Sequence, residues 1–158
     1  MGWCIVIAGT AAFITINIGP GAMGSGVPEL MAYLNGVNYP KLISFQTFIV
    51  KTICVVLAIT TNLFIGKEGP LAHIGANIGV LVIYYIPIKV FQYFQNDVSK
   101  REFVAAGISA GVSAAFGAPI GGCLFSYELS KPTTFWNFDM LWRTFFCSAV
   151  STFTVSTL

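Results

Sequence analysis

Glu68, an acidic side chain inside an apolar sequence, is the residue that most plainly could do chemistry. It lies in the stretch Gly66-Lys67-Glu68-Gly69-Pro70, between a hydrophobic run that ends at Ile65 and another that begins at Leu71. An acid at the centre of a membrane helix costs about 2.5–3.5 kcal/mol, so its presence there indicates a function. The glycine and proline favour the start of a helix, where unpaired backbone N–H groups and the positive end of the dipole attract anions. The stretch therefore predicts an anion site whose resident anion is the Glu68 carboxylate.

Two purely structural explanations of Glu68 stay open: a buried, protonated acid, or an ion pair with Lys67. Adjacent residues on a helix do not face each other, which disfavours the pair. Burial would favour the neutral carboxyl group and the helix N-terminus the charged one, so Glu68 could switch between the two forms. A group that switches in this way suits a gate, and we prefer the functional explanation.

A serine in a loop rich in glycine and proline is the second candidate. Ser25 lies in Gly24-Ser25-Gly26-Val27-Pro28, just ahead of a predicted helix. Non-helical backbone at membrane depth is tolerated only where protein buries it or where it lines a cavity. The hydroxyl and nearby backbone N–H groups could replace water around a dehydrated chloride ion without trapping it. Taken alone, however, Ser25 is better explained as an ordinary helix cap.

The composition places the chain in a lipid bilayer. Of its 158 residues, 56% are hydrophobic and only 9% are charged, which is too apolar for an ordinary soluble domain. A spanning helix takes about 20 residues, so there is room for about six hydrophobic segments and no separate soluble domain. Both ends fall in hydrophobic runs, and we expect a piece of a larger, multi-pass membrane protein.

Charge and cysteine content exclude other classes. The net charge of +2 is dispersed along the chain, so no nucleic-acid partner is expected. The four cysteines lie far apart in apolar surroundings, without the spacing of metal ligands or of a disulfide framework. We therefore expect no metal and no cofactor.

Glycine and proline divide the chain into short or broken helices rather than a row of full spans. Breaks are predicted at Ser25, Glu68 and Pro119. Residues 89–102 form a hydrophilic connection, and its small excess of basic residues weakly favours the cytoplasmic side. Transporters bind anions with broken helices whose N-termini point at the membrane midplane. The predicted helical segments are 3–18, 28–34, 42–65, 71–88, 103–116, 120–130 and 138–158; the fifth contains Gly107-x-x-x-Gly111, which suits close helix packing.

Three stretches in this order resemble signature motifs of the CLC family of chloride channels and chloride/proton exchangers. They are Gly24 to Glu29, Gly66 to Pro70, and Ala114 to Gly122. The resemblance implies an all-α membrane fold of broken, tilted helices, of which residues 1–158 would form part of the first half. It also implies chloride as the transported ion, a lipid bilayer as surroundings, and a homodimer with one pathway in each subunit.

Carried over by position, the resemblance assigns roles to the motif residues. Ser25, with Gly26 and Gly69, would bind chloride, and Glu68 would be the gating acid whose carboxylate competes with chloride. Nitrate-preferring relatives have proline where this chain has Ser25, so the serine points to chloride. Pro119 would have a structural role.

The position after Glu128 separates channels from exchangers within the family. Exchangers have a proton-accepting glutamate there, but this chain has Leu129, which cannot carry a proton. Glu128 is then expected to be structural, and the protein to be a voltage-gated chloride channel. The stretches 100–107 and 135–146 instead resemble the endosomal and lysosomal branch, whose members are exchangers. A chloride/proton antiporter is therefore the alternative, and the endosomal/lysosomal and plasma membranes both remain open.

An intramembrane hydrolase with Ser25 as nucleophile is a remote alternative. The context of Ser25 does not match Gly-x-Ser-x-Gly, and His73, the only histidine, lacks an evident orienting acid. A lone histidine on an apolar helix is more often packed or hydrogen-bonded than a ligand. We expect no enzyme activity, and we expect Asp139 and Arg143, one helical turn apart, to form an ion pair.

Overall fold

Helices make up the part of the chain that the structure describes. The computed structural model describes residues 2–39, 41–61, 66–85, 96–130 and 136–158, and it contains no strand in these ranges. The elements are α1 (Gly2–Ile18), a one-turn 3-10 helix η1 (Pro20–Ala22), α2 (Val27–Leu34), α3 (Phe45–Thr60), α4 (Glu68–Tyr85), α6 (Asp97–Phe116), α7 (Pro119–Ser130) and α8 (Phe138–Thr157). The prediction of an all-helical chain with breaks near Ser25, Glu68 and Pro119 is confirmed.

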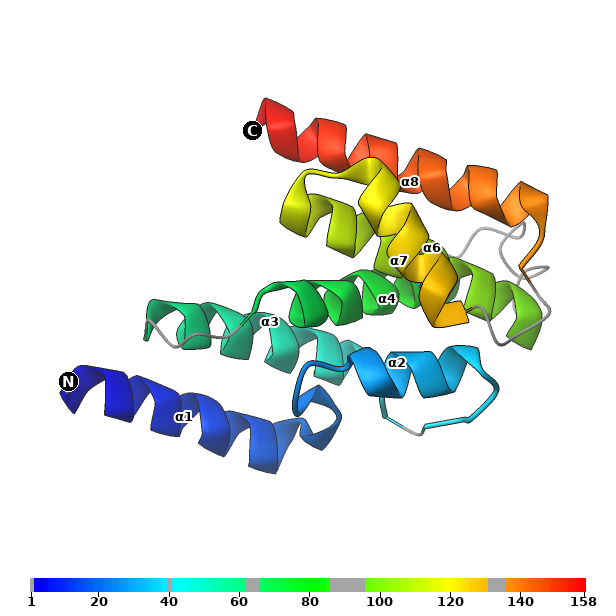
Figure 1. Cartoon of the computed structure of the whole chain (residues 1–158). Helices are drawn as coiled ribbons and strands as arrows, with labels where there is room; N and C mark the ends of the chain where they lie inside the picture. The colour runs from blue at the N-terminus through cyan, green and yellow to red at the C-terminus, as the bar shows by residue number, and fades with distance from the viewer. Residues whose placement is uncertain (1, 40, 62–65, 86–95, 131–135) are drawn as a thin grey trace.

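The longer helices lie side by side in the order α1, α3, α4, α6 and α8 (Figure 1). The two short helices lie against this row: α2 packs on α4, α6 and α7, and α7 also packs on α6 and α8. Among the described residues, no helix combines the length and the hydropathy needed to cross a membrane.

Glycines let the backbones of α4 and α6 touch. A Cβ atom on Gly75 would lie 3.0 Å from the carbonyl carbon of Gly107 and 3.1 Å from the Cα atom of Gly111. A Cβ atom on Gly111 would in turn lie 3.0 Å from the carbonyl carbon of Leu71. The close packing predicted from Gly107-x-x-x-Gly111 is confirmed, and larger side chains there would push the two helices apart.

Buried hydroxyl groups join the helices around α6. The Ser109 hydroxyl donates to the Thr144 carbonyl oxygen of α8 at 3.0 Å, and the Ser126 hydroxyl of α7 donates to the Ala105 carbonyl oxygen at 2.7 Å. These bonds satisfy polar groups that would otherwise be costly to bury. They connect α7 and α8 to α6, the helix that packs closely on α4.

Three helices begin three residues or more from the start that hydrophobicity predicts. α4 begins at Glu68 rather than at residue 71. α6 begins at Asp97 rather than at residue 103, because a polar first turn can be helical when it faces outward. α3 begins at Phe45 rather than at Leu42, because the Ser44 hydroxyl oxygen caps it by accepting from the Thr47 N–H group at 3.2 Å. Parts of the predicted segments, at 62–65, 86–95 and 131–135, lie outside the described residues.

Candidate anion site

The start of α4 contacts the loop before α2. A Cβ atom on Gly69 would lie 2.8 Å from the Ser25 Cβ atom and 3.3 Å from the Ser25 carbonyl oxygen, so only glycine allows this approach. The structure therefore brings together the four residues that the sequence predicts for anion binding and gating, namely Ser25, Gly26, Glu68 and Gly69.

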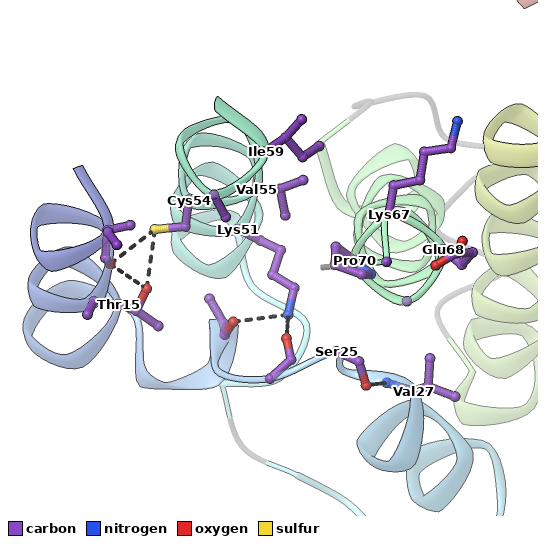
Figure 2. A pocket seen from close by; sticks show the side chains of 18 of the residues that line it. Thr15, Ser25, Val27, Lys51, Cys54, Val55, Ile59, Lys67, Glu68 and Pro70 are labelled. Carbon is purple, nitrogen blue, oxygen red and sulfur yellow. Dashed lines mark hydrogen bonds between the residues drawn. The ribbon is translucent and has the colours of Figure 1, made fainter. Parts of the chain in front are cut away.

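A cavity of about 750 Å³ opens where these elements meet. Ser25, Glu68 and Gly69 line it, together with residues of α1, α3 and α7 (Figure 2). Gly26 is buried beside it and is not among the lining residues. The lining is mostly apolar, so the few polar groups in it act in surroundings poor in water.

The local geometry of Ser25 does not match that of an ordinary helix cap. The residue that caps α2 is Gly26, in the left-handed conformation at φ +83°, and no side chain caps this helix. The Ser25 hydroxyl oxygen accepts from the Val27 N–H group only at 3.4 Å, which is long for a hydrogen bond. The Ser25 side chain is exposed to the cavity, and its own O–H group is available to donate.

Glu68 is the first residue of α4 and is partly buried. Its carboxylate bends back over Gly66, where a side chain would collide with the Glu68 Oε2 atom. The structure shows no ion pair between Glu68 and Lys67; the two side chains leave the helix in different directions (Figure 2). The Leu71 N–H group donates to the Lys67 carbonyl oxygen at 3.1 Å. Among the described residues, the Glu68 and Gly69 N–H groups before it have no backbone acceptor, so they can attract an anion.

Lys51 is a buried cation that the sequence analysis missed. Its side chain is only 2% exposed, although it lines the cavity. Its ammonium group donates to the carbonyl oxygens of Ala22 at 3.0 Å and Gly24 at 2.6 Å (Figure 2). The sequence held a signal: Lys51 is the one charged residue in the apolar segment 42–65, and ionisable residues in such segments are usually functional.

These groups make the cavity favourable for an anion. Lys51 has three N–H donors, and two of them bond to neutral carbonyl groups. Within the described ranges Lys51 forms no ion pair. Three groups at this cavity attract anions: the positive N-terminal end of α4, the Ser25 hydroxyl donor and the Lys51 ammonium. Glu68 is the acidic residue in the same lining.

The residues predicted on α7 lie in different surroundings. Leu129 is 8% exposed and belongs to the hydrophobic core formed by α2, α4, α6 and α8. Glu128, one residue earlier, is exposed. Pro119 is the first residue of α7, and its carbonyl oxygen accepts from the Ser148 hydroxyl at 2.9 Å.

The ion pair predicted between Arg143 and Asp139 is wrong. Arg143 instead contacts Glu102 at 3.3 Å, because the packing of α8 on α6 brings these side chains together.

His73 is fully buried, and its Nε2–H group donates to the Leu42 carbonyl oxygen at 3.0 Å. The structure shows no hydrogen bond from His73 to Ser25, so the arrangement of a serine hydrolase is not present.

Comparison with known proteins assigns the chain to a family. The family model described as "Voltage gated chloride channel" matches residues 4–158. The chain belongs to the voltage-gated chloride channel (CLC) family. Among its CLC relatives, the human "H(+)/Cl(-) exchange transporter 7" is 43% identical over 158 residues, with 92% of the chain and 19% of that protein covered. The mouse protein of the same name is 45% identical over 149 residues, covering 90% of the chain and 18% of that protein.

A more distant CLC relative, "Chloride channel protein A" of Dictyostelium discoideum, is 38% identical over 159 residues; 96% of the chain and 18% of that protein are covered. The chain thus spans about a fifth of the length of these relatives. The CLC fold is an all-helical membrane fold, and this chain forms part of it.

Proposed function

We propose that this chain forms one side of a pathway that moves chloride across a membrane. Ser25, Gly26 and Gly69 would surround the ion, and Glu68 would gate it. The observation that carries the proposal is the contact between the Ser25 loop and the first turn of α4, beside a cavity that also receives the buried Lys51 ammonium. These donors can replace part of the water that chloride loses, which is otherwise very costly in a medium of low dielectric constant.

Glu68 suits a gate because it is an anion at an anion site. Glu68 lines the same cavity as Ser25, and its carboxylate lies over Gly66. From the start of α4 it would compete with chloride for the same positive potential. When it is protonated or displaced, the potential of the α4 N-terminus and of Lys51 is left for chloride.

Leu129 favours a voltage-gated channel over an exchanger. The side chain at the position where family exchangers carry a proton acceptor is apolar and packed in the core. It cannot bind a proton, so chloride would cross without obligatory proton movement. In this function two copies of the complete protein would form a homodimer in a lipid bilayer, with one pathway in each copy.

A chloride/proton antiporter is the second candidate. Several relatives that are 43–45% identical are named as H(+)/Cl(-) exchange transporters. For this candidate we propose an endosomal or lysosomal membrane rather than the plasma membrane. In an antiporter, protons would have to reach Glu68 by a route that does not include position 129.

The reversal potential of the complete protein tests both candidates. Chloride and pH gradients are varied separately across a planar bilayer or a membrane patch. A potential that follows chloride alone supports the channel, and one that also shifts with the pH gradient supports the antiporter. Absence of any chloride flux would refute the proposed function as a whole.

A further inference from the structure

His73 lies between two segments that are far from it in the sequence. It is on α4, five residues after Glu68, and its side chain is 0% exposed. Its Nε2–H group donates to the Leu42 carbonyl oxygen at 3.0 Å. Because that nitrogen is the donor, the other ring nitrogen, Nδ1, carries a lone pair in the neutral ring.

The Nδ1 side of the ring faces Gly26. A Cβ atom on Gly26 would collide with the His73 Nδ1 atom and would lie 2.8 Å from the Cγ atom. Gly26 also has φ +83°, a conformation that favours glycine. The chain therefore needs glycine at position 26 for two independent reasons, and one of them is the histidine ring.

The Leu42 carbonyl group is itself held in place. Lys41 before it has φ +74°, which is rare for a residue with a side chain. The Lys41 carbonyl oxygen accepts from the Thr47 hydroxyl at 2.7 Å, so the turn is fixed to the start of α3. Leu42 is buried in the core. His73 thus connects a fixed turn on one side to the Ser25 loop on the other.

The Nδ1 atom of His73 is buried and has no hydrogen-bond partner among the residues that the structure describes. Leaving a buried acceptor unsatisfied is unfavourable, and a leucine of similar volume would avoid that penalty. A histidine can still be favourable at this position if its bond to Leu42 and the contact of its ring with Gly26 hold the Ser25 loop in place. Since Gly26 directly follows Ser25, a shift of the ring would move the hydroxyl relative to Glu68.

We infer that His73 is a positioning residue of the anion site, which sets the place of the Ser25 loop against α4 and so the preference for chloride over other anions. This inference rests on the proposed function. His73 does not touch the ion; it acts through Gly26. Small anions such as chloride and nitrate differ in size and shape, so their relative permeability reports the spacing of the donors around them.

Two substitutions separate positioning from simple packing in the complete protein. His73→Gln keeps an amide N–H group that can donate to the Leu42 carbonyl oxygen, whereas His73→Leu keeps the volume but removes the donor. Asn77→Leu is the matched control. Asn77 is buried one turn later on α4, and its side-chain amide donates to the His73 carbonyl oxygen at 2.9 Å, a bond that stays within the helix.

The measurement is the chloride-to-nitrate permeability ratio from reversal potentials. We expect a fall of about three- to tenfold in His73→Leu, the loss that one hydrogen bond accounts for, and a change below about twofold in His73→Gln and Asn77→Leu. A wild-type ratio in His73→Leu, or an equal fall in all three variants, would overturn the inference while the proposed function stands. If His73→Leu does not reach the membrane, His73→Asn, too short to reach Leu42, must show the fall. A wild-type protein without chloride current would instead refute the proposed function.

Discussion

Replacing Lys51 by methionine should weaken chloride binding at the Ser25 site by about 30- to 100-fold. The Lys51 Nζ atom lies 2.6 Å from the Gly24 carbonyl oxygen, and Ser25 is the next residue. Successive Cα atoms are 3.8 Å apart, so about 6–8 Å separate the ammonium group from an ion at the Ser25 hydroxyl. At an effective dielectric constant of about 20, a unit charge at that distance contributes about 2–3 kcal/mol, which corresponds to the stated loss of affinity.

Isothermal titration calorimetry of the purified complete protein with chloride measures this loss of affinity. Lys51→Arg keeps the charge and donors for the Ala22 and Gly24 carbonyl groups, so it should bind within about threefold of the wild type. Lys51→Gln keeps a neutral donor without the charge. It separates the effect of the charge from that of the two hydrogen bonds, and we expect it to bind as weakly as Lys51→Met.

Two results would contradict this reasoning about Lys51. If Lys51→Met bound chloride within about threefold of the wild type, the buried charge would not act on the site. If Lys51→Gln restored full affinity, the hydrogen bonds to the loop rather than the charge would be responsible. In either case the attraction of chloride would have to come from the helix N-termini and the Ser25 hydroxyl.

Three further substitutions test other parts of the site and its support. Glu68→Ala should remove gating and leave conduction open, and an unchanged response of the current to voltage and pH would count against it. Ser25→Ala removes one hydroxyl donor and should lower chloride affinity about two- to tenfold in the same titration, whereas an unaltered affinity would mean that the hydroxyl does not contact the ion. Gly107→Leu would force side-chain atoms against the backbone of Gly75 and should destabilise the protein by about 1–3 kcal/mol or more, seen as a lower unfolding temperature; a wild-type melting curve would show that α4 and α6 can separate without cost.

The local signals were readable in the sequence because each depends on residues within a turn or two of one another. Glycine and proline predicted the breaks before α2, α4 and α7, and the isolated acid and serine predicted where chemistry could occur. The small residues of Gly107-x-x-x-Gly111 predicted a close helix contact. The starts of α3 and α6 were misplaced because hydrophobicity does not register a side-chain cap or an outward-facing polar turn.

Lys51 and Arg143 show why the remaining contacts could not be predicted from neighbouring residues in the sequence. The partners of Lys51 are backbone carbonyl groups, which every residue has, so no residue type marks them. Arg143 had an acid one turn away, yet the packing of α8 on α6 brought Glu102 closer. In both cases the choice of partner depends on which helix faces lie together.

The sequence alone thus determined the family motifs, the helical class and the presence of an acid and a hydroxyl at helix breaks. Only the tertiary structure placed Gly69 against Ser25, buried the Lys51 ammonium under the same loop, and set His73 between Leu42 and Gly26. The physical reason is that an anion site needs donors from several helices within a few ångströms. Such convergence is decided by helix packing, which a local pattern of residues does not specify.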